Sequence, residues 1–200
     1  MSTSAGSFHN VAYTRTHRIL HWLIAFTFLY MLLTAWLRMN WMNKNVIGEI
    51  VTASLKTQNV HLSDKIAANI GRAVRRPMWN THIYAGYVLL LLYVVRLVVM
   101  RIEGTVFSNP FSRQISKKER FRSAVYLVFY ICLGTSLLTG IYIELIGKVY
   151  PAVYNAMKAV HVQSLYYSVI FIFLHLGGLV LAELGADRGI ISRMIHGKRG

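Results

Sequence analysis

The sequence predicts an all-α integral membrane protein built as a single bundle of four membrane-spanning helices. Hydrophobic residues make up 55% of the 200 residues, charged residues make up only 14%, and the mean hydropathy is +0.44. The apolar residues gather in four runs, each close to the roughly 20 residues that a helix needs to cross a bilayer. This composition excludes an ordinary soluble domain, so we treat residues 1–200 as one membrane domain.

Four spans are predicted, at about residues 19–37, 81–100, 124–143 and 161–182. Residues 39–79 separate the first two spans and are predicted to form a long loop outside the membrane. In the second half of this loop, Leu62, Ile66 and Ile70 recur at helical spacing, which indicates a short amphipathic helix lying on the membrane surface. A loop of this length is typical of a functional segment.

The net charge of +15 comes from basic residues that lie between the spans rather than on a periodic soluble face. We therefore expect them to meet membrane lipid headgroups and not nucleic acid. Four spans place both termini on one side, which carries 12 Lys and Arg residues, six of them within 101–122, against eight on the other side. The positive-inside rule then predicts cytoplasmic termini and a periplasmic loop 39–79.

Four histidines lie in or at the ends of the spans, and the topology sets their depths. His161 and His175 are fourteen residues apart, which is 3.9 helical turns, so they share a face of span four and stand roughly 21 Å apart along it. His21 begins span one on the cytoplasmic side, and His82 begins span two on the opposite side. Equal depth predicts two pairs, His21 with His175 and His82 with His161.

Paired imidazoles of this kind favour haem over other metal groups. Two histidines without a thiolate or carboxylate make a poor zinc site, but they suit the two axial positions of haem iron. With both axial positions filled, such a haem carries single electrons, and two haems at different depths provide a path across the membrane. The sequence has one cysteine, Cys132, and no C-x-x-C-H attachment motif, so the haems are expected to be of the non-covalent b type.

Two further features support this interpretation. Gly86, one turn after His82, and the glycines after His175 leave room for a macrocycle. Arg96 lies fourteen residues after His82, at the depth of His21 and His175, where it can pair with a haem propionate. The alternatives are a packing or proton-relay role for single histidines, an interfacial role for Arg96 and His17, and a helix-packing role for the glycines.

On these residues the sequence resembles the superfamily of bacterial cytochrome b561 and Ni-Fe hydrogenase b-type cytochromes, which includes the formate dehydrogenase cytochrome b subunit. The similar pieces are RTHRILHWL (15–23), THIYAGYVLLLLYVVR (81–96), the His161/His175 spacing and the tail GIISRMIHGKRG (189–200). The resemblance implies a four-helix core in the bacterial inner membrane that holds two haem b groups. Their axial ligands map onto His21, His82, His161 and His175.

Three functions are compatible with these features. The first is an electron-transfer subunit between a periplasmic redox enzyme, similar to a hydrogenase or another dehydrogenase, and the membrane quinone pool. The family resemblance implies that the quinone binds at the cytoplasmic end, near His17, Arg18 and Arg96. The second is a stand-alone b561-type oxidoreductase that links quinone to a small molecule such as superoxide. The third is a transporter or channel. It would need acidic residues within the spans, and only Glu183, at the end of span four, comes close.

Overall fold

The computed structural model describes residues 14–104, 109–112, 114–147, 149–185 and 188–197, and within these ranges it is all-helical. Its helices are α1 (Arg15–Met39), α2 (Lys44–Lys56), α3 (Asp64–Ile102), α4 (Lys117–Leu145), α5 (Pro151–Val162), α6 (Ser164–Leu184) and α7 (Ile190–His196). Four helical runs are long and apolar enough to cross a membrane, namely α1, α3, α4 and the α5–α6 run. The predicted fold class is confirmed, and each of the four predicted spans lies within one of these runs. Residues 198–200, the end of the tail similarity, lie outside the described ranges.

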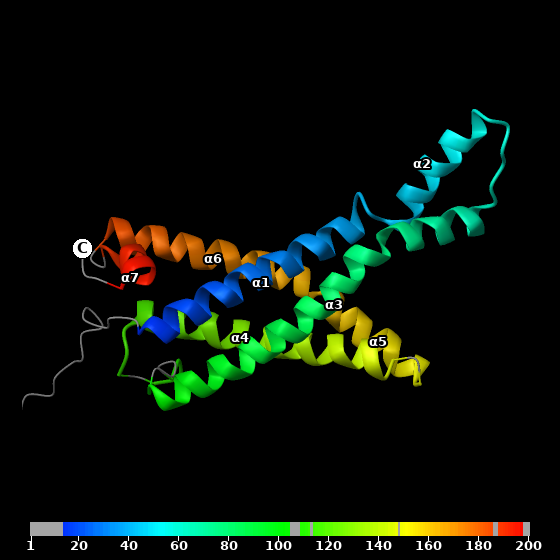
Figure 1. The fold of residues 1–200 in the computed structure, drawn as a ribbon. Coiled ribbons are helices and arrows are strands. Elements are labelled where there is room, and N and C mark those ends of the chain that lie inside the picture. The colour runs from blue at the N-terminus through cyan, green and yellow to red at the C-terminus, as the bar shows by residue number, and fades with distance from the viewer. Residues whose placement is uncertain (1–13, 105–108, 113, 148, 186–187, 198–200) are drawn as a thin grey trace, which may run out of the picture.

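The four spanning runs lie lengthwise beside one another (Figure 1). The start of α1, the end of α3 and helix α7 lie at one end of this bundle, and the start of α5 lies at the other end. From that second end, α2 and the first half of α3 project beyond the bundle. The two ends of the described chain therefore lie together, as an even number of spans requires.

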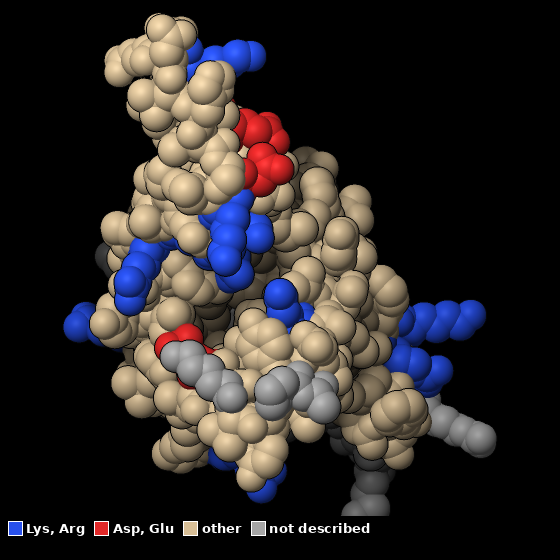
Figure 2. Space-filling view, turned by 90° about the vertical axis from the view of Figure 1, so that its right-hand side faces the viewer, with Lys and Arg blue, Asp and Glu red and all other residues tan. Residues whose placement is uncertain are grey.

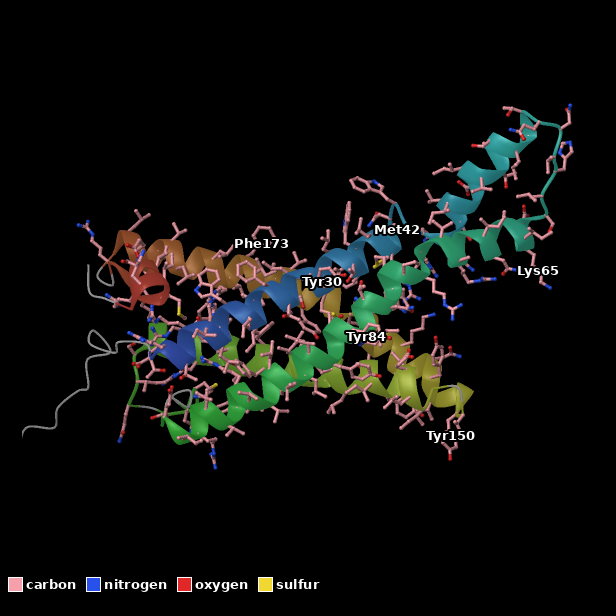
Figure 3. All side chains as sticks on the ribbon, in the orientation of Figure 1. Tyr30, Met42, Lys65, Tyr84, Tyr150 and Phe173 are labelled. Carbon is pink, nitrogen blue, oxygen red and sulfur yellow. The ribbon has the colours of Figure 1, made fainter. Side chains whose placement is uncertain are left out.

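A small apolar core holds the spans together. Phe28 of α1, Leu89 of α3, and Leu133 and Leu137 of α4 are buried in one cluster. The outer faces are also apolar, and Phe173 on α6 is 74% exposed (Figure 3). A bundle that leaves large apolar side chains on its outer surface is suited to lipid rather than to water.

Local sequence signals account for the beginnings of the helices. The Thr14 hydroxyl accepts a hydrogen bond from the His17 amide at the start of α1. Ser116 accepts one from the Glu119 amide at the start of α4, and this Ser-x-x-Glu spacing is that of a capping box. Such caps satisfy amide groups that have no partner within the helix.

Residues 39–79, predicted as a long loop with one short amphipathic helix, are more helical than expected. Most of this segment is helical, and α3 continues without a break from Asp64 through Pro77 into span two. Helices α2 and α3 pack closely here, because a Cβ added at Gly48 or Gly71 would overlap the backbone of the other helix. The predicted amphipathic helix is present, but it is continuous with span two and packed on α2. We call residues 44–77 the arm.

The prediction of span four as one uninterrupted helix beginning at residue 161 also needs correction. The helical run begins at Pro151, ten residues earlier, and is interrupted at Gln163 between α5 and α6. The Gln163 amide bonds to the Val160 carbonyl, three residues back, instead of continuing the four-residue pattern. His161 and His175 therefore lie on opposite sides of a bend, which is visible where α5 meets α6 (Figure 1).

Candidate functional site

The predicted histidines lie in two groups towards opposite ends of the bundle. His21 comes from the first half of α1 and His175 from the second half of α6, near the end that carries α7. His82 lies five residues after Pro77 on α3, and His161 lies in the last turn of α5, both towards the end that carries the arm. Each group thus draws one side chain from each of two different helices.

His21 and His175 face each other across the bundle. Their ring centroids are 6.2 Å apart and their planes are inclined by 47°. Two imidazoles bound to one metal ion through bonds of about 2.0–2.1 Å place their centroids about 6 Å apart, so the spacing suits a shared ion. The Tyr126 hydroxyl on α4 lies 3.2 Å from His175 Nδ1, and Phe171 stacks on the same ring. With Nδ1 of His175 engaged, Nε2 is the nitrogen left to face a metal.

The His82 ring is held by two neighbours and is only 7% exposed. Its Nδ1 lies 2.7 Å from the Thr34 hydroxyl oxygen, which is also within hydrogen-bond distance of the Tyr30 and Met31 carbonyls. If Thr34 donates its single proton to one of these carbonyls, it accepts from His82 Nδ1–H, which leaves Nε2 with a free lone pair. The Trp79 indole stacks on the ring at 4.4 Å and 11°.

His161 is held in the same manner from α4. Its Nδ1 lies 2.9 Å from the Ser136 carbonyl oxygen, which can only accept, so Nδ1 carries the proton. The ring packs against Gly140, where an added Cβ would lie 2.9 Å from Cε1. His82 and His161 lie within electrostatic range of each other. This arrangement prepares the Nε2 atoms of two neighbouring helices as ligands.

Arg96 lies at the His21–His175 end. One terminal nitrogen donates to His17 Nε2 at 2.7 Å, and its Nε lies 3.4 Å from the Tyr130 hydroxyl. The other terminal nitrogen, Nη1, is buried without a partner in the described structure. His17 lies in turn 3.6 Å from a Glu103 carboxylate oxygen. A buried guanidinium group with a free N–H is suited to an additional carboxylate.

Comparison with known proteins identifies the family. A family model described as "Prokaryotic cytochrome b561" matches residues 12–197. The chain belongs to the prokaryotic cytochrome b561 family. Neither a curated protein nor a solved structure gave a match.

As a member of this family, the protein is a membrane b-type cytochrome that functions in electron transfer and binds b-type haem. The residues of this cytochrome fit such a group. No cluster of three or more His, Cys, Asp or Glu side chains that could hold a metal ion occurs in the described ranges. An added Cβ would meet nothing within 4 Å at Gly177 and Gly178, and only the Met31 methyl group at 3.6 Å at Gly86. Gly177 and Gly178 therefore border open space, whereas a side chain at Gly86 would contact Met31.

Several residues of the cytochrome's site were not predicted as such. Thr34, Tyr126 and Ser136 engage the Nδ1 atoms of three of the four histidines. Their signal in the sequence is only that they are polar residues inside apolar spans. Which polar residue meets which histidine depends on how the helices are rotated against one another, and the spacing within one span does not contain that information.

Proposed function

We propose that this cytochrome holds two haem b groups, one between His21 and His175 and one between His82 and His161. In this proposal, the protein carries electrons between a periplasmic redox enzyme and the quinone pool of the bacterial inner membrane. The observation that carries the proposal is the presence of a histidine pair towards each end of the bundle. In these pairs, hydrogen bonds at Nδ1 of His82, His161 and His175 leave Nε2 available. A bound b haem supplies one-electron chemistry.

The chain's own residues account for the rest of this activity. His21, His175, His82 and His161 would hold the two haems, which would supply one-electron transfer without binding oxygen or substrate at the metal. The hydroxyl and carbonyl partners of Nδ1 fix the orientation of the His82, His161 and His175 rings and raise their basicity as ligands. Arg96, with its unpartnered Nη1, would neutralise a propionate of the haem at the His21–His175 pair.

For the quinone, we propose the end of the bundle that carries α7. A shallow apolar groove of about 410 Å³ opens there, lined by Arg15, Arg18, Ile19, Trp22, Leu23, Phe26 and Ile195. Trp22 packs edge-on against the His21 ring, with 5.6 Å between the centroids. An apolar groove next to a ligand ring is suited to an isoprenoid quinone that arrives from the lipid.

For the protein partner, we propose docking at the arm. The arm extends beyond the bundle at the His82–His161 end, and its base adjoins Trp79, which stacks on His82. It carries six basic residues against two acidic ones, and Figure 2 shows Lys and Arg side chains at the base of the arm. A rigid, basic projection next to one haem site can orient an anionic redox partner. If the purified protein oxidised or reduced a small molecule without any partner, the stand-alone alternative would be favoured.

Haem content tests the central claim. The purified protein should contain two haems per chain with low-spin spectra, and acid-acetone should extract both because no covalent attachment motif is present. A stoichiometry of one haem or none would contradict the proposal. Quinone linkage is tested separately, by the reoxidation of the reduced haems when a soluble quinone analogue is added to the protein in vesicles.

A further inference from the structure

Arg38, in the last turn of α1, lies in a stack with Trp79 and His82. Its guanidinium carbon is 3.6 Å from the centroid of the Trp79 ring. The Trp79 ring also stacks on His82, whose ring centroid is 4.4 Å away and whose plane is nearly parallel to it. Trp79 and His82 are three residues apart on α3, so one helical face presents both rings to Arg38. The stack thus links a cation to a proposed haem ligand.

The charge of Arg38 has no counter-ion among the described residues. None of them forms a hydrogen bond or an ion pair with its guanidinium group, and Arg75 is a cation within electrostatic range. The contact with Trp79 orients the guanidinium group, but a neutral ring cannot cancel its charge. A half-buried cation next to a second cation is unfavourable unless an anion joins them. An anion beside Arg38 would relieve this unfavourable arrangement.

The position of Arg38 indicates which anion this is. Arg38 lies within electrostatic range of both His82 and His161, the two side chains between which the second haem would lie. At the other end of the bundle, Arg96 has the same relation to His21, and one of its nitrogens is buried without a partner. Each histidine pair is thus accompanied by one arginine with unused capacity for a carboxylate.

We propose that Arg38 binds a propionate carboxylate of the haem held by His82 and His161. This inference rests on the proposed haem sites and extends them with a residue that the sequence did not single out. A guanidinium group is suited to this role because its planar fork can bind both carboxylate oxygens. Trp79 is a positioning residue, because its ring contacts both the Arg38 guanidinium group and the His82 ring.

The proposal has a measurable electrostatic consequence. Reduction of a haem adds one negative charge to it, and a fixed positive charge nearby favours the reduced form. Arg38 therefore raises the reduction potential of the haem at the His82–His161 pair. Because the other pair lies near the opposite end of the bundle, the haem there should respond much less.

The test is a spectroscopic redox titration of the purified holoprotein. The variants are Arg38→Gln and Arg38→Lys. The control is Arg75→Gln, which removes the neighbouring cation and leaves the contact between Arg38 and Trp79 in place. The component of the His82–His161 pair is identified by its loss in His161→Ala. We expect Arg38→Gln to lower the potential or the occupancy of that component alone, Arg38→Lys to cause a smaller shift in the same direction, and Arg75→Gln to cause the least change.

Unchanged potentials and occupancies of both components in Arg38→Gln would overturn the inference, as would an equal shift of both components. If the Arg38→Gln variant does not accumulate, the Arg38→Lys variant provides the test. Lysine lacks the planar guanidinium group, so the potential of the haem at the His82–His161 pair should still shift, and an unchanged potential would contradict the proposal. Failure of the proposed function is distinguishable, because it would appear in the wild-type protein as fewer than two haems. A wild-type protein with two haems and an unresponsive Arg38→Gln variant would contradict only the inference about Arg38.

Discussion

At the scale of single residues, the orientation of three of the four histidine rings depends on a hydrogen-bond partner at Nδ1. Thr34, Ser136 and Tyr126 each engage a different ring, and each comes from a helix other than the one that carries the histidine. The sequence predicted the four histidines because imidazole is rare and costly within a span. Threonine, serine and tyrosine are common in spans, so their roles became visible only with the packing of the helices.

These partners give a reciprocal prediction. Thr34→Val leaves the buried His82 Nδ1–H without an acceptor, and Tyr126→Phe removes the hydroxyl group at His175. Loss of such an outer hydrogen bond typically weakens metal binding about 10- to 100-fold. We expect each variant to lose haem from its own pair and to retain the other spectral component.

Absorption spectra after titration with a haem-scavenging apoprotein measure this retention. Thr27→Val is the matched control, because the Thr27 hydroxyl bonds only to a carbonyl of its own helix, on an exposed face. Equal loss of both components in either variant would show that the hydroxyl groups stabilise the bundle as a whole and not one haem site.

At the scale of helices, the spans were predictable and the connections between them were not. Hydropathy identifies a span because about 20 apolar residues stand out against their neighbours. The arm has a mixed composition, and Pro77 suggests a helix boundary, since proline lacks an amide hydrogen and usually ends or kinks a helix. The structure continues α3 through Pro77, and the packing of α2 against α3 at Gly48 and Gly71 holds the segment before it.

The close packing within the arm predicts the effect of a larger side chain. Gly71→Leu would drive a side chain into the backbone of Lys44, and overpacking of this kind typically costs about 1–3 kcal/mol. We expect faster proteolysis of the turn between α2 and α3, with the haem content unchanged because the histidine pairs lie inside the bundle. Ala73→Leu, on an exposed face of the same helix, should have little effect. Loss of haem in Gly71→Leu would show that the arm supports the haem sites directly.

At the scale of the whole molecule, the arrangement of the ends follows from the number of spans. Both described chain ends lie at the end of the bundle opposite the arm, as four crossings demand (Figure 1). Depth could be predicted because a helix rises by a fixed length per residue, and this holds for α3, where His82 and Arg96 are separated by roughly 21 Å. The bend at Gln163 could not be predicted from hydropathy, since the apolar character continues across it.

The orientation of the bundle gives a labelling prediction. On a Cys132→Ser background, an impermeant thiol reagent applied from the periplasmic side should label Gln58→Cys at the tip of the arm and should not label Gln114→Cys before α4. Gln58 is preferable to its neighbour Asn59, whose φ of 60° disfavours most side chains. The reverse pattern would place the arm in the cytoplasm and exchange the proposed partner and quinone ends, while the pairing of the histidines would stand.

The last prediction tests that pairing through the whole molecule. If His21 and His175 hold one haem, replacing either with alanine should remove the same spectral component, and His82→Ala and His161→Ala should both remove the other. One iron cannot be shared between pairs at depths roughly 21 Å apart, because a metal–imidazole bond is only about 2 Å long.

The two classes of variant should also differ in electron flow. Without the haem near the arm, a periplasmic donor should fail to reduce the protein. Without the haem near α7, the donor should still reduce the remaining haem, but reoxidation by quinone should stop. If His21→Ala removed the component that His82→Ala removes, the pairing would be wrong even though all four residues were ligands.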